Sequence, residues 1–244
     1  MEGGIIAAGH GSRLKKGGMV VPKPLLKING TELIGRTVSE FKKAGIYNIR
    51  VIFRKRICEQ CSEYLATAFP ECRFRILCKD TESSAESFLT LLEGANGSDR
   101  LLLTTVDSIF APGALDSFVE KALKMPKDHV ILGVTRYVDD EKPLFVSFGD
   151  KADNKITAIG GTDGDAVTCG VYLMPQNIWT QRQEVAFPAL RAFLSHLFHK
   201  GIGFCGVDMG KVIDVDRPED IKEAEKFLNM AEKGTSAKDS NRTP

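Results

Sequence analysis

The feature that most constrains the fold is an alternation of strand-like and helix-like segments over the first 135 residues. The strand-like segments are short apolar runs, and the segments between them carry apolar residues at helical spacing. Strands are expected at 3–8, 48–53, 73–78, 100–106 and 129–135, and helices at 31–44, 57–68, 83–93 and 112–123. Four β-α units in series predict a three-layer α/β/α fold around a mostly parallel, mixed sheet, with helices on both faces.

The pattern changes after Arg136. Short strands are expected at 144–148, 155–159, 168–174, 204–207 and 211–213, with a polar turn at 149–154, and helices are expected at 184–199 and 218–230. Residues 231–244 lack large apolar side chains, so we expect a disordered tail there. One domain over residues 1–230, with halves at 1–135 and 136–230, accounts for the rest.

The charge balance excludes several classes of protein. The chain has 33 Lys and Arg against 32 Asp and Glu, a net charge of +1, whereas coating nucleic acid or an anionic membrane requires a large cationic excess. No apolar run approaches the roughly 18 residues of a membrane-spanning helix, and the first residues lack the basic segment of a secretory signal. We therefore expect a cytoplasmic protein with no nucleic-acid or membrane partner.

The cysteines and histidines do not form a convincing metal site. Cys58 and Cys61 are a C-x2-C pair, but they lie in a segment with an amphipathic helical pattern and not on the tight turn of a zinc knuckle. We expect them to be reduced, partly buried thiols. His196 and His199 share a helix face without a third ligand at metal-like spacing.

A glycine-rich loop follows the first strand. It reads Ala7-Ala8-Gly9-His10-Gly11-Ser12-Arg13, and a Pro-Lys-Pro-Leu-Leu segment containing Lys23 comes shortly after it. Between Gly3 and Asn29 there are five Lys and Arg and no acidic residue, so this stretch predicts a polyphosphate ligand held by main-chain N–H groups and cations. The dinucleotide fingerprint does not fit because position 14 is Leu, and the P-loop motif is absent.

The two halves of this motif together resemble the nucleotidyltransferases that activate sugar phosphates, the nucleoside-diphosphate-sugar pyrophosphorylases. The resemblance is densest over residues 3–53 and implies a GT-A-like, Rossmann-related fold, with a nucleotide-binding half followed by an acceptor-binding half. It implies nucleotide binding by the loop residues and by Thr105, with Arg13 on the β- and γ-phosphates and Lys23 on the α-phosphate. Arg13 and Lys23 would be the catalytic cations, a fork for spread oxygens and a point charge for one centre.

Two aspartates are the expected metal ligands. Asp107 follows the most apolar strand, although Val106 stands where the family usually has Gly, and an N-cap role is the alternative for this aspartate. The late segment Asp214-Val215-Asp216-Arg217-Pro218 is similar to a family motif that carries the second metal carboxylate. We expect only one of these two aspartates to face the site and favour Asp214, with Asp216 as the cap of the last helix. Two carboxylates with phosphate oxygens and waters suit Mg²⁺.

The acceptor residues are less well defined. Lys142 lies in a Glu-Lys-Pro segment that resembles the family's acceptor-phosphate contact, and a solvated surface role is its alternative. Gly170 resembles the glycine of a Gly-Val-Tyr strand against which the acceptor lies. The resemblance implies an NTP and a phosphorylated small molecule as partners, and it leaves homo-oligomerisation open.

Three functional readings remain open. The first is transfer of a nucleoside monophosphate to a phosphorylated acceptor with release of pyrophosphate, with a sugar 1-phosphate favoured and a small phospho-alcohol accepting a cytidylyl group as the alternative. The second is a GT-A glycosyltransferase, because Asp214 and Asp216 form a D-x-D motif. The third is a nucleotide-sensing domain without turnover.

Overall fold

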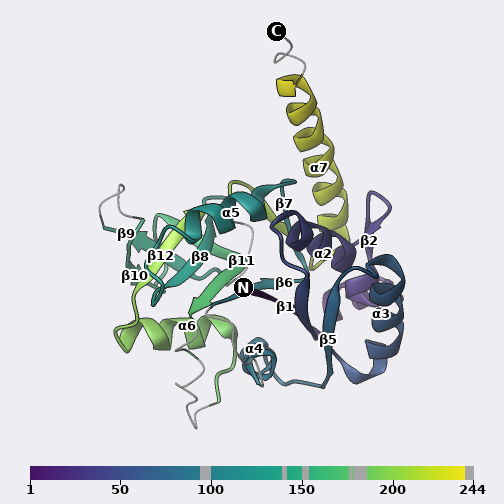
Figure 1. Ribbon diagram of the computed structural model, residues 1–244, viewed down its shortest axis with the longest axis horizontal. Coiled ribbons are helices and arrows are strands. Elements are labelled where there is room, and N and C mark those ends of the chain that lie inside the picture. The colour runs from purple at the N-terminus through teal and green to yellow at the C-terminus, as the bar shows by residue number, and fades with distance from the viewer. Residues whose placement is uncertain (94–99, 139–141, 150–153, 176–177, 179–185, 240–244) are drawn as a thin grey trace.

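The strands of the predicted β-α units form the parallel part of the central sheet (Figure 1). The computed structural model describes residues 1–93, 100–138, 142–149, 154–175, 178 and 186–239. Strand β1 (Glu2–Ala7) pairs in parallel with β4 (Asn48–Phe53) on one side and with β6 (Arg100–Thr105) on the other, and β4 pairs in parallel with β5 (Arg73–Cys78). The carboxyl ends of these four strands therefore share one edge of the sheet.

The second half of the chain completes the sheet with mixed pairing. Strand β11 (Ala166–Pro175) inserts antiparallel between β6 and β8 (Val130–Thr135), and β12 (Phe204–Asp208) pairs in parallel with β8. Strands β9 (Phe145–Phe148) and β10 (Ile156–Ile159) pair antiparallel with each other, and β9 pairs antiparallel with the first residues of β11. The described residues thus form a nine-stranded sheet that is mixed, as predicted.

Helices cover both faces, because neighbouring strand residues point to opposite sides. Ile5 and Ala7 of β1 belong to one buried cluster, which also contains residues of α2 (Leu33–Lys43), α3 (Lys55–Ala68), α5 (Ala114–Ala122) and α7 (Pro218–Asp239). Ile6 belongs to the other cluster, with residues of α4 (Ser84–Leu92) and α6 (Leu190–His199). The predicted three-layer arrangement is confirmed.

Short elements around the predicted loops were not expected from the sequence. They are α1 (Ser12–Lys16), the 3-10 turn η1 (Lys23–Leu25), the hairpin of β2 (Lys27–Ile28) and β3 (Thr31–Glu32), and β7 (Ser108–Phe110), which pairs with β13 (Val212–Asp214), the strand expected at 211–213. Each has five residues or fewer, which is too short for an apolar period to show. None of the described helices is long and apolar enough to cross a membrane.

Two helix boundaries differ from the predictions by more than two residues. Helix α6 begins at Leu190, because residues 186–189, which include Pro188, are not helical. Helix α7 runs to Asp239 and extends away from the sheet (Figure 1), so the expected disorder from residue 231 is wrong as far as 239. Positions 184–185 and 240–244, and residues 150–153 of the predicted turn, lie outside the described part of the chain.

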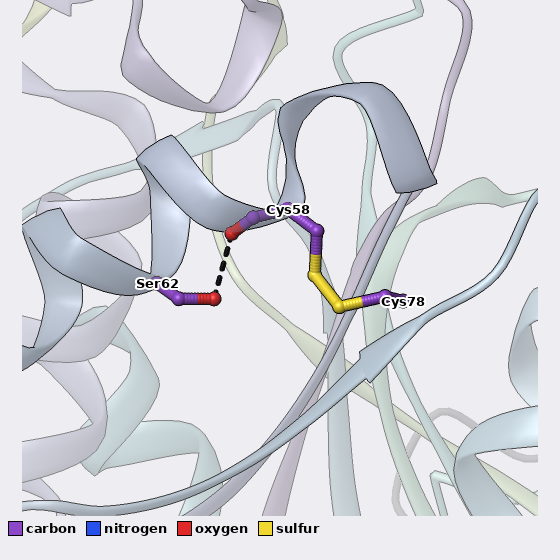
Figure 2. The surroundings of a disulfide bond; sticks show 3 residues. All are labelled: Cys58, Ser62 and Cys78. Atoms are coloured by element: carbon purple, nitrogen blue, oxygen red, sulfur yellow. Dashed lines mark hydrogen bonds between the residues drawn. A yellow bond between two sulfur atoms is a disulfide. The ribbon is translucent and has the colours of Figure 1, made fainter.

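The expectation of a reduced Cys58 is also wrong. Cys58 in the first turns of α3 forms a disulfide with Cys78 at the end of β5, with a Cα–Cα distance of 5.7 Å (Figure 2). Parallel pairing sets Phe53 beside Cys78, and the chain turns from Phe53 directly into α3, which brings the two sulfurs together. The free cysteines of the described residues are buried: Cys61, Cys72, Cys169 and Cys205.

Candidate active site

The predicted site residues gather where the sheet reverses its strand order. The chain passes from β1 outward to β4 and β5 and then returns to β6 on the other side of β1. In open α/β sheets, ligands bind where the loops that leave the carboxyl ends of the strands diverge at such a reversal. The glycine-rich loop follows β1, and Asp107 follows β6.

The glycine-rich loop is open to solvent. Ala7 and Ala8 are buried at the end of β1, whereas Gly9, His10 and Ser12 are exposed. Gly11 has a φ of 57°, a left-handed conformation in which glycine avoids the strain of a side chain, and it leads into α1. A Cβ atom at Gly11 would lie 3.4 Å from Cβ of Lys23, so the loop and the Pro-Lys-Pro segment are in close contact.

The Lys23 side chain is the centre of the site. It is buried, with 7% of the side chain exposed, and its Nζ lies 2.6 Å from Oδ2 of Asp107 and 2.6 Å from Oδ1 of Asp216. Arg13 on α1 reaches the same cluster, because its Nη1 donates to Oδ2 of Asp216 at 3.0 Å. The structure thus brings the predicted catalytic cations Arg13 and Lys23 together with Asp107.

Asp216 is a site residue, although its position before Pro218 predicts the cap of the last helix. The carboxylate that caps the start of α7 belongs instead to Asp220, which accepts from the backbone N–H groups of Asp216 and Arg217. The side chain of Asp216 is left to contact Lys23 and Arg13. The signal was available in the sequence, because residues i and i+2 of an extended segment share a face, so Asp214 and Asp216 were both able to face the site.

Asp214 lies at the end of β13, next to the segment that carries Asp107. It is paired across from Ser108 in the β7–β13 ladder, and its Oδ1 accepts from Ser108 Oγ at 2.8 Å. The backbone N–H of Val215 donates to the carbonyl oxygen of Asp107, which fixes the two segments side by side. The predicted metal pair Asp107 and Asp214 is therefore adjacent, while Asp216 is the aspartate of this motif that contacts Lys23.

Electrostatics separate the roles of these groups. Burial opposes ionisation of Asp107, but the Lys23 ammonium and the hydrogen bonds outweigh it and hold the Asp107 pKa below its usual value. Burial likewise opposes the charged form of Lys23, yet Asp107 and Asp216 raise the Lys23 pKa. The surrounding protein atoms displace water from the Asp214 carboxylate, and this desolvation raises the pKa of Asp214. The negative charge of Asp107 raises it further. Lys23 and Asp107 are therefore both charged and form an ion pair.

Gly170 of β11 packs against the hydroxyl groups of Thr105 and Ser108. It has a φ of 78° at an irregularity in the β8–β11 ladder between Thr168 and Tyr172. A Cβ atom at this position would overlap the hydroxyl oxygens of both Thr105 and Ser108, which are themselves 2.8 Å apart. Only glycine fits, so Gly170 is required by packing around two of the hydroxyls that support the site.

A small recess lies near Asp214 and is also lined by Thr135, Tyr137 and Thr168. The other predicted acceptor residue, Lys142, is exposed on the segment before β9, and Arg191 of α6 donates to its carbonyl oxygen at 3.2 Å. Glu141 of the Glu-Lys-Pro segment lies outside the described part of the chain, as do residues 139–140 before it.

With this geometry, the chain matches the MobA-like NTP transferase domain family over residues 3–164. The match covers more than half of the chain, and the chain belongs to this family. The resemblance expected from the glycine-rich loop and the Lys23 segment is confirmed.

Curated relatives span the chain as well. The bifunctional IPC transferase and DIPP synthase of Aquifex aeolicus is 23% identical over 227 residues, which is 92% of this chain and 51% of the relative. The protein of the same name from Archaeoglobus fulgidus is 26% identical over 245 residues, 95% of this chain and 44% of the relative. The chain thus spans about half the length of the curated relatives it matches.

Solved structures share the fold. An inositol-1-phosphate CTP transferase from T. maritima superposes with a TM-score of 0.77 at 21% identity, covering 93% of this chain and 97% of that one. A putative glucose-1-phosphate thymidylyltransferase from Bacillus anthracis gives a TM-score of 0.78 at 20% identity, with coverages of 93% and 94%. These likenesses confirm the GT-A-like nucleotidyltransferase fold.

Proposed function

We propose that this chain transfers a nucleoside monophosphate from an NTP to a phosphorylated small molecule and releases pyrophosphate. The observation that carries the proposal is the buried Lys23 ammonium between two carboxylates, directly beside a glycine-rich loop whose surrounding sequence has no acidic residue. Membership of the NTP transferase family supports the same reaction.

The chemistry needs alignment and charge neutralisation more than proton transfer. An acceptor phosphate has a second pKa of about 6, so its oxygen is already a nucleophile at neutral pH. That oxygen attacks the α-phosphorus, the bond from the α-phosphorus to the bridging oxygen breaks, and pyrophosphate leaves with the electron pair. Lys23 would neutralise the α-phosphate and Arg13 the departing phosphates, which are the terms that dominate phosphoryl transfer.

The carboxylates fit a hard divalent cation. One oxygen of Asp107 and one of Asp216 lie 2.6 Å from the Lys23 nitrogen, so the two carboxylates converge on the position of that ammonium. A metal ion held by both carboxylates would take that position, and the Lys23 ammonium would turn to the α-phosphate. Among the described residues, no group of three or more His, Cys, Asp or Glu side chains could hold a metal ion, so phosphate oxygens and water would supply the remaining ligands. We propose Mg²⁺, which supplies charge neutralisation when bound, with Asp107 and Asp216 as its protein ligands and Asp214 beside them on the acceptor side.

Two acceptor classes remain. The curated relatives are named IPC transferases, and one solved relative in fold is named an inositol-1-phosphate CTP transferase, which favours CTP and a polyol phosphate. A second solved relative is named a glucose-1-phosphate thymidylyltransferase, which keeps a sugar 1-phosphate as the second candidate. Both acceptors carry one phosphate on a hydroxylated ring, so one assay can compare them as substrates.

The deciding experiment measures pyrophosphate release with Mg²⁺ for each of the four NTPs, with inositol 1-phosphate or glucose 1-phosphate as acceptor. We expect turnover with one nucleotide and one acceptor class, and CTP with inositol 1-phosphate to be the best pair. Binding of an NTP without pyrophosphate release from any pair would contradict the proposal and indicate a nucleotide-sensing domain.

A further inference from the structure

Arg54 is a nearly buried arginine at the carboxyl edge of the sheet, directly after β4, with 16% of its side chain exposed. Its Nη1 lies 2.8 Å from Nε2 of His10 in the glycine-rich loop. Its Nη2 lies 3.2 Å from Oδ1 of Asp80, in the segment that follows β5. One guanidinium therefore spans two of the loops at this edge.

The contact with His10 fixes an otherwise open loop. A guanidinium has only donors, so Nε2 of His10 must accept, and the neutral ring then carries its proton on Nδ1. His10 is exposed, and a Cβ atom at the neighbouring Gly9 would meet no other atom within 4 Å. Because little else packs against this part of the loop, the bond from Arg54 restricts its position.

The other end of the link is anchored to the sheet. Lys79, directly before Asp80, donates its backbone N–H to the carbonyl oxygen of Phe53 at 2.9 Å. The disulfide joins Cys78 to Cys58, which is four residues after Arg54 (Figure 2). Asp80 thus follows a segment that is tied both covalently and through the backbone to the region around Arg54, and it orients the guanidinium toward the loop.

We infer that Arg54 is a positioning residue that holds the glycine-rich loop, through His10, in the shape that receives the triphosphate. The inference rests on the proposed function. A loop that is ordered before binding does not have to be ordered by the ligand. Loss of this order should therefore weaken binding of the nucleotide. The recess near Asp214, where we place the acceptor, is not lined by Arg54, His10 or Asp80, so acceptor binding should not depend on Arg54.

The test compares Arg54→Ala, Arg54→Lys, His10→Ala and the double variant Arg54→Ala/His10→Ala, using the most active NTP and acceptor. Arg73→Ala is the matched control, because Arg73 is an exposed arginine at the opposite end of β5. We measure KM for each substrate, kcat, and the Kd of the NTP with Mg²⁺ by calorimetry. Thermal unfolding verifies that each variant is folded.

Arg54→Ala should raise the KM and Kd for the NTP by about tenfold, the loss of one charge-assisted hydrogen bond, with kcat and the acceptor KM changed by less than about threefold. Arg54→Lys keeps the charge but reaches one partner at a time, so its nucleotide KM should be intermediate. The double variant should be no worse than the poorer single variant, because both changes remove one interaction. The Arg73 control should match the wild type.

Two results would overturn the inference while leaving the proposed function intact. One is an active wild type whose nucleotide KM and Kd are unchanged by Arg54→Ala. The other is additivity of the two substitutions, which would mean that Arg54 does not act through His10. If Arg54→Ala does not fold, Arg54→Lys and His10→Ala decide the matter by the same measurements. A wild type that releases no pyrophosphate from any pair would remove the proposed function itself, and the inference with it.

Discussion

Nζ of Lys23 lies 2.6 Å from Oδ2 of Asp107, although 84 positions separate the two residues in the chain. The same nitrogen is 2.6 Å from Oδ1 of Asp216, which is 193 positions away from Lys23. One ammonium group therefore joins the segment after β1, the end of β6 and the start of α7. Its removal should affect both the reaction and the fold.

Lys23→Ala should lower kcat by at least about a hundredfold, because the proposed charge neutralisation at the α-phosphate is lost. The measurement is pyrophosphate release at saturating substrates. Lys27→Ala is the matched control, since Lys27 lies four positions further along the same basic stretch but its side chain is 62% exposed. Equal activities for Lys23→Ala and the wild type would show that the assigned mechanism is wrong.

The stability of Lys23→Ala should depend on pH with a definite sign. In the wild type the depressed pKa of Asp107 contributes stability above its ordinary value of about 4, and this contribution is lost as the pH falls through the folded pKa. Without Lys23, less positive charge offsets the effect of burial on the Asp107 carboxylate, so the pKa of Asp107 in the folded state rises. The variant therefore loses stability as the pH rises above about 4. The unfolding free energies should differ by about 2 kcal/mol at pH 8 and by less at pH 4. Urea denaturation at both pH values measures this difference, and a pH-independent difference would contradict it.

The three aspartates should separate by their response to Mg²⁺. Asp107→Asn and Asp216→Asn remove proposed metal ligands, so both should lower kcat by about a hundredfold or more and raise the Mg²⁺ concentration for half-maximal activity. Asp214→Asn keeps an oxygen that can accept from Ser108 and should need nearly the same Mg²⁺ concentration as the wild type. A Mg²⁺ requirement that is shifted in Asp214→Asn and unchanged in Asp216→Asn would instead make Asp214 the second ligand, as the sequence predicts.

Gly170→Ala should destabilise the protein by about 3 kcal/mol, because the new methyl group overlaps two hydroxyl oxygens and the backbone has a positive φ. Gly201→Ala is the control for the backbone contribution alone, since Gly201 has a φ of 83° and a Cβ atom there would meet nothing within 4 Å. It should cost about 1 kcal/mol. The difference between the two variants, from chemical denaturation, isolates the overlap, and equal losses would exclude it.

Reduction of the Cys58–Cys78 disulfide should lower the free energy of unfolding by about 3 kcal/mol, the value expected for closing a loop of this length. Thermal unfolding with and without dithiothreitol measures the effect in the wild type, and Cys58→Ser should show no effect of the reductant. In denaturant without reductant, two of the six cysteines should fail to react with a thiol reagent. Six reactive thiols would contradict the bond.

The β-α units were predictable because buried parallel strands are apolar over their whole length, as in Leu101, Leu102 and Leu103 of β6. The basic loop and Asp107 were predictable for the same reason, because they directly follow such strands. The ends of helices were harder to predict, since the part of α7 beyond Met230 has no apolar stripe to mark it.

The disulfide and the role of Asp216 were beyond local patterns. Cys58 and Cys78 meet because β4 and β5 are neighbours in a particular register, which spacing alone does not give. Asp216 contacts Lys23 because another carboxylate, Asp220, takes the capping position that its place before Pro218 indicated. In both cases the deciding partner lies in another segment, or competes for the same local role.

Strand β11 has a consequence for how this protein is made. It lies between β6 and β8, so during synthesis β6 has no partner on that side until residues 171–175 have left the ribosome. An unpaired apolar strand edge is a template for association with other chains. A fragment that stops at residue 135 should therefore aggregate when expressed alone, because the two halves of the molecule share one sheet.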